Sequence, residues 1–402
     1  MSKKYTVASV FSGCGGLDLG FIQQGFKVIW ANDFFVEAVG TYRRNIGKHI
    51  VYGDITNIPS SEIPDKFDVF LGGFPCQGFS ISNNGRNMKD KRNFLYLEML
   101  RIIKDKKPKF FVAENVKGLL SMEGGRVINM IMEDFRKLGY KTDYKLLKAS
   151  NYGVPQNRER VIIIGNRLNL VNIFPKITHG IPSGLFNKDS KPLVTVRDAV
   201  GYLENVELSE EPINHKTGII YNHVAAIDVC STYLTRKYKF DFCVICDYLK
   251  YWKDKKGLST KEIKLHFKDR NSVSSWFKED SNIAVIPNKE DWLKLKKVLK
   301  FDNKHDKVMT TMIQKNKVFE SQLRVNPWNR PASTVLASNS TIHPNRKRRM
   351  SVRENAVVQT FPKDYIFNGS LENMQKQVGN AVPVLFANKI AEVIKMQLDG
   401  IK

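Results

Sequence analysis

The sequence has few cysteines, no long apolar run and a shortage of acidic residues, and each shortage excludes a class of protein. Its five cysteines are odd in number and scattered over 402 residues, which argues against a disulfide framework and for a reducing compartment. No apolar run reaches membrane-spanning length, and residues 1–5 lack the apolar stretch of a signal peptide. We therefore expect a cytoplasmic protein that does not enter a membrane.

The shortage of acidic residues makes the chain strongly basic. Asp and Glu number 40 against 64 Lys and Arg, so the net charge is +24. Such an excess indicates a polyanionic partner. Lysine richness in an AT-rich genome is the alternative explanation. It does not account for the dense cluster Asn345, Arg346, Lys347, Arg348 and Arg349.

Short apolar runs alternate with helical patterns over the first 166 residues, which is typical of an α/β fold. We predict strands at residues 6–11, 28–32, 50–55, 67–71, 110–113, 144–147 and 161–165. We predict helices at residues 17–24, 35–45, 94–103 and 123–138, and a closing helix at 383–397. With 402 residues, of which 42% are hydrophobic, the chain is long enough for a sizeable core and two domains.

Cys76 follows the strand at 67–71 after two glycines and a proline. Such a corner holds a side chain at the carboxyl edge of a sheet, where open α/β folds bind ligands. Cys76 is therefore a candidate nucleophile, although a small buried thiol is the commoner fate of a lone cysteine. The polar segment 81–93 behind it is a candidate lid over the substrate, with a plain surface loop as the alternative.

A glycine-rich turn at residues 12–16 joins the first strand to the first helix. Such a turn lets the backbone approach a ligand closely and directs helix N-terminal amides at it. Asp33 and Asp54 lie at the carboxyl ends of the second and third strands, at the same edge of the predicted sheet. Asp33 could accept hydrogen bonds from ribose hydroxyls, or it could simply cap the next helix.

Five segments resemble, in order, the motifs of the DNA (cytosine-5) methyltransferases. They are FSGCGG at 11–16, GFPCQGFS at 73–80, ENV at 114–116, QNRER at 156–160 and QVGNAVP at 377–383. The resemblance covers residues 5–166 and 346–390. It implies a Rossmann-like S-adenosylmethionine-dependent methyltransferase sheet with a second, smaller target-recognition domain. We place the catalytic and cofactor-binding domain at 1–195, the target-recognition domain at 196–345 and a C-terminal return at 346–402.

The same resemblance implies roles for individual residues. Cys76 would attack cytosine C6, Glu114 would contact N3, and Arg158 and Arg160 would clamp the O2 side and the flanking backbone. A solvated basic edge is the alternative for the two arginines. The residues implied for S-adenosyl-L-methionine are Phe11, Ser12, Gly13, Gly15, Gly16, Leu17, Asp33, Asp54, Ile55, Pro75 and Asn380. The residues expected to contact DNA are Gln77, Ser80, Arg270, Asn271, Ser274, Lys278, Arg346 and Arg348.

The middle of the chain carries its own pattern. Residues 258–267 and 272–279 predict two helices joined by a short turn, the layout of a helix-turn-helix. Its outward side chains, Arg270, Asn271, Ser274, Ser275 and Lys278 among them, suit base edges and phosphates. An ordinary α-hairpin has the same pattern. Cys243 and Cys246 could be half of a zinc site, but their apolar neighbours favour buried thiols, so we expect no metal.

Together these features predict a prokaryotic, sequence-specific methyltransferase that acts on C5 of a flipped-out cytosine in double-stranded DNA. The covalent intermediate would join Cys76 to C6. An RNA (tRNA) cytosine-5 methyltransferase is the alternative, although the large middle region favours DNA. A non-catalytic DNA-binding regulator is the second alternative. We expect a monomer from a restriction-modification system, and the sequence leaves open whether a companion restriction endonuclease acts on the same site.

Overall fold

The computed structural model describes residues 4–74, 95–180, 190–227, 303, 324–338, 341–345 and 348–400. The chain divides into two compact units. The first contains Met1–Ala225, Pro327–Asn339 and Ser351–Lys402, and the second contains Ala226–Asn326 and Ser340–Met350. The first unit therefore continues past residue 195, where we placed the end of the catalytic domain. The assignment of the second unit to target recognition stays a prediction.

Several predicted features lie outside the described residues. They are Pro75, Cys76, Gln77, Ser80, the segment 81–93, the cysteines 243 and 246, the helix-turn-helix at 258–279 and Arg346.

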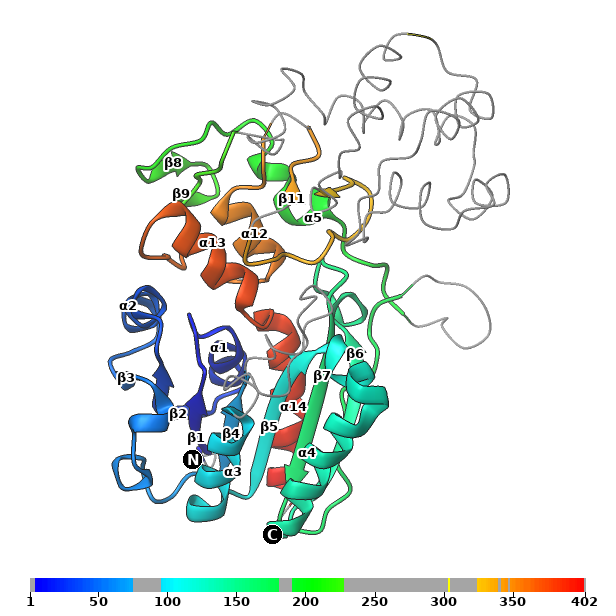
Figure 1. Ribbon diagram of the computed structural model, residues 1–402. Coiled ribbons are helices and arrows are strands. Elements are labelled where there is room, and N and C mark those ends of the chain that lie inside the picture. Colours follow the sequence, from blue (N-terminus) through cyan, green and yellow to red (C-terminus); the bar gives the residue numbers. More distant parts are fainter. Residues whose placement is uncertain are drawn as a thin grey trace. The chain divides into compact units, whose positions relative to one another are not determined.

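A seven-stranded sheet forms the centre of the first unit (Figure 1). Its strands are β1 (Thr6–Val10), β2 (Lys27–Asp33), β3 (Ile50–Tyr52), β4 (Val69–Gly72), β5 (Phe110–Val116), β6 (Lys141–Lys148) and β7 (Glu159–Asn166). The order is β3-β2-β1-β4-β5-β7-β6, with β7 antiparallel to both of its neighbours and the other pairs parallel. This confirms the predicted α/β class. The order reverses between β1 and β4, where open α/β sheets bind ligands at the carboxyl ends of the strands.

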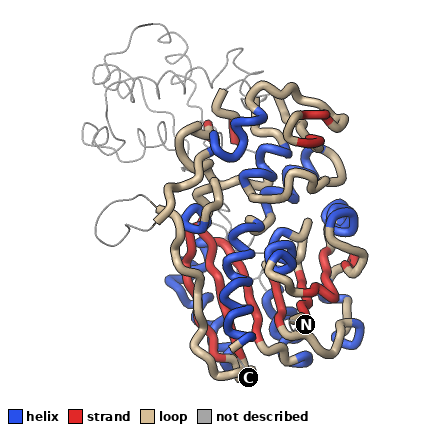
Figure 2. Tube along the Cα trace, turned by 180° about the vertical axis from the view of Figure 1, so that it is seen from behind, coloured by secondary structure: helices blue, strands red, loops and turns tan. Residues whose placement is uncertain are grey.

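Helices cover both faces of this sheet because its strands are apolar on both sides. One face packs against α1 (Gly16–Gln23) and α14 (Val384–Asp399), through side chains such as Phe21, Phe386 and Ile390 (Figure 2). The other face packs against α3 (Leu95–Lys106) and α4 (Arg126–Lys137), through side chains such as Met99 and Phe135. Each fully buried Phe or Ile contributes about 1.5–3 kcal/mol to the fold.

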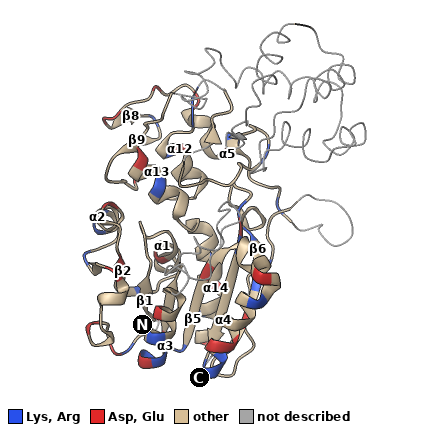
Figure 3. Ribbon diagram, in the orientation of Figure 1, with Lys and Arg blue, Asp and Glu red and all other residues tan. Residues whose placement is uncertain are grey.

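Charged residues of both signs lie on α3 and α4 (Figure 3). Strand β5, in contrast, is almost entirely buried. No helix among the described residues is long and apolar enough to cross a membrane.

Two predicted elements have different bounds for clear local reasons. The helix expected from residue 123 begins at Arg126, because Glu123, Gly124 and Gly125 have positive φ angles that a helix cannot continue. A 3₁₀ turn, η5 (Lys117–Gly125), precedes it instead. The third strand ends at Tyr52, because Asp54 caps the short 3₁₀ turn η1 (Ile55–Asn57) through its side chain.

The remaining described elements of the first unit are mostly helical. They are the 3₁₀ turns η2 (Ser60–Glu62), η6 (Ala149–Tyr152) and η7 (Gly201–Leu203), the helices α2 (Val36–Asn45), α5 (Val196–Val200), α12 (Val352–Val358) and α13 (Leu371–Asn380), and the hairpin β8 (Ile213–His215) and β9 (Gly218–Ile220). In the second unit, β10 (Arg324–Val325) and β11 (Thr341–Ile342) pair in parallel.

Candidate active site

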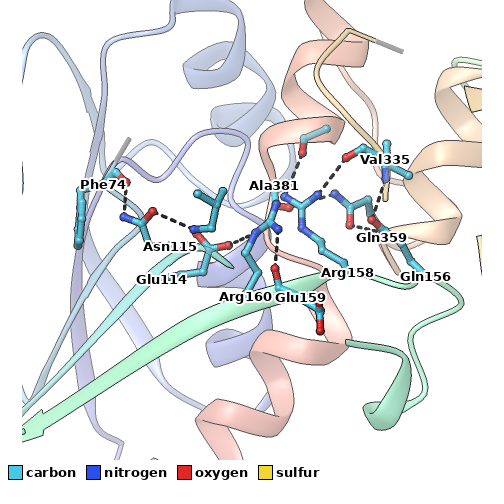
Figure 4. Close-up of polar contacts among 12 residues, drawn as sticks. Phe74, Glu114, Asn115, Gln156, Arg158, Glu159, Arg160, Val335, Gln359 and Ala381 are labelled. Carbon is cyan, nitrogen blue, oxygen red and sulfur yellow. Dashed lines mark hydrogen bonds and ion pairs between the residues drawn. The ribbon is translucent and has the colours of Figure 1, made fainter. Parts of the chain in front are cut away.

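Glu114 and Arg160 form an ion pair on the sheet, with 2.7 Å between Arg160 Nε and Glu114 Oε1 (Figure 4). The register explains the pair: Arg160 of β7 lies opposite Val116 of β5, and Glu114 lies two residues before Val116 on the same face. Each side chain is 11% exposed. Burial lowers the pKa of Arg160 and the Glu114 carboxylate opposes that effect, so the guanidinium keeps its charge. The predicted N3 partner and the predicted clamp are therefore in contact.

The exit of β4 lies directly beside Glu114. A Cβ added to Gly73 would be 3.6 Å from Glu114 Oε2, which is ordinary van der Waals contact. Asn115 holds the next residue, because its Nδ2 donates to the carbonyl of Phe74 at 3.1 Å. Phe74 is the last described residue before the segment that contains Cys76. Our sequence analysis did not single out Asn115, whose side chain anchors this corner from the neighbouring strand.

Arg158, the second predicted clamp residue, binds main-chain carbonyls. Its side chain is buried, with 2% exposed, and its two Nη atoms donate to main-chain carbonyls of Val335 and Gly379 at 3.0 and 3.1 Å. Both Nη atoms that were expected to reach the substrate therefore have protein partners. Arg158 precedes the first residue of β7, so the simple alternation of an extended strand does not place it beside Arg160. The clamp role of Arg158 stays a prediction.

The loop after β1 is held against the end of β2 by Asp33. The Asp33 carboxylate accepts hydrogen bonds from Gly13 N at 2.7 Å and from Phe35 N at 2.8 Å. Burial raises the pKa of Asp33, and these two donors act in the opposite direction. Each carboxylate oxygen keeps a second lone pair, so these bonds leave acceptor capacity for a ligand.

The residues implied for the cofactor divide into open and packed positions. Gly13 has a φ of +54° and an added Cβ would meet nothing within 4 Å, so the loop is open there. At Gly15 a Cβ would overlap Ile46, and at Gly16 it would overlap the carbonyl of Val382. Packing against backbone therefore requires glycine at position 16, and a φ of +90° favours glycine at position 15.

Other implied cofactor residues divide in the same way. Ser12, Leu17 and Ile55 are buried, and Phe11, half-buried with a φ of +55°, begins the turn. Asp54 and Asn380 are exposed. Asp54 accepts hydrogen bonds from the main chain and hydroxyl of Thr56, and Asn380 is the last residue of α13. The exposed ring of Phe34, 65% accessible beside Asp33, is a further candidate that the sequence analysis missed.

A chain of buried hydroxyl groups also stabilises the loop after β1. Ser12 donates to Ser9, Ser9 donates to Asp18 Oδ1 at 2.7 Å, and Tyr42 donates to Asp18 Oδ2 at 2.8 Å. Asp18 is fully buried on α1. Burial raises the pKa of Asp18 to about 6, while the two hydroxyl donors act in the opposite direction.

We expect Asp18→Asn to change how stability depends on pH. A carboxyl whose folded pKa exceeds its unfolded value stabilises the fold below the unfolded pKa, and this contribution is lost as pH rises through about 6. Relative to Asp18→Asn, the wild type should therefore lose up to about 3 kcal/mol of unfolding free energy between pH ~4 and pH ~8. Urea denaturation at several pH values measures the difference.

Asp198→Asn is a control of opposite sign. Hydrogen bonds from Thr195 lower the pKa of Asp198, so its contribution should be lost as pH falls below the usual range of a carboxyl group. A wild-type and Asp18→Asn difference that stays constant with pH would show that Asp18 does not titrate in this range.

Arg348, which is predicted to contact DNA, is largely buried. It is 9% exposed, and its Nη1 donates to the carbonyl of Arg349 at 3.1 Å. Its predicted contact with DNA stays a prediction. No group of three or more metal-ligating side chains occurs in the described part of the chain.

Comparison with known proteins decides the family. The model of the C-5 cytosine-specific DNA methylases matches residues 5–396. The chain belongs to that family. It is 31% identical to the type II methyltransferase M.BspRI of Lysinibacillus sphaericus over 98% of this chain and 82% of that protein. It is 33% identical to the type II methyltransferase M.NgoFVII of Neisseria gonorrhoeae, over 95% of this chain and 84% of that one.

Solved structures share the fold of this chain. A prophage-encoded protein of Escherichia coli, described as a DNA modification methyltransferase, aligns with a TM-score of 0.60 at 22% identity, over 98% of this chain and all of that one. The methyltransferase EhMeth of Entamoeba histolytica aligns with a TM-score of 0.59 at 14% identity, over 99% of each chain. The protein is thus a DNA (cytosine-5) methyltransferase of the type II class, as the five motifs predicted.

Proposed function

We propose that the enzyme methylates C5 of cytosine in double-stranded DNA through a bond between Cys76 Sγ and cytosine C6. Cytosine C5 is too weak a nucleophile to take a methyl group directly. Addition of the thiolate to C6 makes C5 enamine-like, and a proton from Glu114 at N3 stabilises the developing charge. The electron pair at C5 then forms the bond to the methyl carbon. Loss of the C5 proton to a base and departure of the thiolate from C6 restore the ring and free Cys76.

The observation that best supports this proposal is the position of Glu114. It lies against Gly73 at the exit of β4 and pairs with Arg160. A carboxyl group and a cation therefore lie beside a residue that precedes Cys76 by three positions in the sequence. A base stacked inside a duplex cannot reach such a site, and we infer that the cytosine is rotated out of the helix first.

S-adenosyl-L-methionine is the proposed methyl donor, and it would supply a methyl group activated by a positively charged sulfonium. The residues present fit it. The open backbone at Gly13 and the spare lone pairs of Asp33 suit the close approach and ribose hydroxyls of a nucleoside. The exposed ring of Phe34 offers a stacking surface for adenine at the same strand end.

The test is methyl transfer from labelled cofactor to duplex DNA and, separately, to transfer RNA. We expect label in DNA and none in RNA, and bisulfite sequencing of the DNA identifies the cytosine. Label in RNA alone would replace the proposed substrate. Resistance of the methylated DNA to a restriction endonuclease would test the restriction-modification role that the names of the relatives suggest.

We infer that the middle of the chain selects the DNA sequence, through residues 258–279. Replacing Asn271 or Ser274 with alanine should relax the methylated sequence, at about 1–3 kcal/mol for each lost base contact. Replacing Lys278 or Arg270 should instead weaken binding to all sequences alike and reduce its salt dependence. Genome-wide methylation profiles separate the outcomes. Variants that keep the wild-type sequence set and salt response would leave the segment as a scaffold.

A further inference from the structure

Gln359, the residue that follows α12, is fully buried and has a side chain bonded at both ends. Its Nε2 donates to the carbonyls of Val378 and Ala381, at 2.6 and 3.0 Å. Its Oε1 accepts from Nε2 of Gln156 at 2.8 Å (Figure 4). One amide therefore joins the end of α13 to the loop that precedes β7.

The two carbonyls that accept from Gln359 Nε2 belong to the side of the site assigned to the cofactor. Val378 and Ala381 lie on either side of Asn380 in the sequence. The residue after Ala381, Val382, lies against the glycine-rich loop, because a Cβ on Gly16 would overlap the carbonyl of Val382. Cys14 Sγ also contacts the carbonyl of Gln377 at 3.6 Å. Displacement of the turn at 378–382 would therefore displace the loop that we assign to the methyl donor.

Gln156, which donates to Gln359 Oε1, is connected to the side of the site assigned to the cytosine. Gln156 is fully buried, its Oε1 accepts from Val335 N at 2.9 Å, and its main-chain carbonyl accepts from Arg158 N at 3.0 Å. Two residues after Arg158, in β7, comes Arg160, which pairs with Glu114.

Arg158 forms a second connection between the loop before β7 and the end of α13. It binds the carbonyls of Val335 and Gly379 with its two Nη atoms. At Gly379 any side chain would overlap the backbone of Leu336 and Ala337, so these segments lie in direct contact.

We propose that Gln359 is a positioning residue that keeps the methyl-donor side of the site in register with Glu114 and Arg160. Methyl transfer requires two reactants in one geometry, and a displacement of about 1 Å between them can cost ~100-fold in rate. Each half-site is also held by its own contacts, so each ligand can still bind when the link is lost. The inference rests on the proposed assignments of the cofactor loop and of the Glu114–Arg160 pair.

The experiment compares Gln359→Met with Gln397→Met. Gln397 is also a buried glutamine, 8% exposed, whose amide bonds main-chain groups of Val171 and Ile173 near the far end of α14. We expect both variants to lower the melting temperature. Only Gln359→Met should slow single-turnover methyl transfer, by about 10- to 100-fold, with equilibrium Kd values for DNA and for S-adenosyl-L-methionine within about twofold of wild type.

Gln156→Met and the double variant distinguish positioning from general loosening, and Gln156→Met replaces Gln359→Met if that variant does not fold. If both glutamines act through one hydrogen-bonded link, the double variant should be no slower than the slower single variant. Rates that multiply, or an equal loss in Gln397→Met, would overturn the proposal. So would a wild-type rate in folded Gln359→Met. These results would leave the proposed chemistry intact as long as Cys76→Ser is inactive.

Discussion

Cys76→Ser should abolish DNA methylation, to below a few per cent of the wild-type rate, while DNA binding survives. The hydroxyl of serine is a far weaker nucleophile than a thiolate at neutral pH, so the bond to C6 would not form. Affinity for DNA comes mainly from phosphate contacts made elsewhere, and it should be unaffected. Methyl transfer from labelled cofactor and a binding titration on the same preparation measure the two properties.

Two controls test whether the loss of activity is specific to Cys76: a second cysteine variant and a trapped covalent intermediate. Cys230→Ser removes a cysteine outside the five family segments and should leave the rate unchanged. DNA with 5-fluorocytosine should form a stable covalent complex with the wild type, because C5 then carries fluorine in place of the proton that a base must remove before the thiolate can leave. Peptide mapping should locate the bond at Cys76. A Cys76→Ser variant with substantial activity, or a bond at another residue, would remove Cys76 from its role.

Glu114→Gln should slow methyl transfer by about 10²–10⁴-fold, the usual contribution of a positioned proton donor. Amide and acid are similar in size, and the amide oxygen can still accept from Arg160, so the local packing should persist. The amide cannot transfer a proton to N3, and it removes one charge from the buried pair. Single-turnover rates measure the effect, with the Kd of S-adenosyl-L-methionine expected to stay within about threefold of wild type.

Glu159→Gln is the matched control for this variant. Glu159 is adjacent to Arg160 in β7 and pairs with Lys117 at 2.8 Å, but its side chain is 41% exposed. An exposed pair of this kind contributes little, so its loss should leave both rate and stability nearly unchanged. A wild-type rate in Glu114→Gln would make Glu114 a structural residue, and the proton donor would have to be sought elsewhere.

The sequence predicted the existence and order of the strands well, because periodicity and turn residues act over a few positions. The apolar run before Gly72 and Gly73 and the run that contains Glu114 both became central strands, β4 and β5. The bounds were less accurate. The expected strand at 110–113 ends only at Val116, so Glu114 lies inside β5 and pairs with Ile162 of β7, one residue beyond the last residue that pairs with β4.

The sequence alone determined the α/β class, the family and the identity of the residues assigned to chemistry, since these depend on local patterns and short motifs. Only the tertiary structure decided what each side chain contacts. Arg158 and Arg160 are two residues apart, yet one binds main-chain carbonyls of Val335 and Gly379 and the other binds Glu114. The Gln156–Gln359 bond joins residues 203 positions apart. Such contacts depend on sheet register and on which distant segments pack together, and no local pattern carries that information.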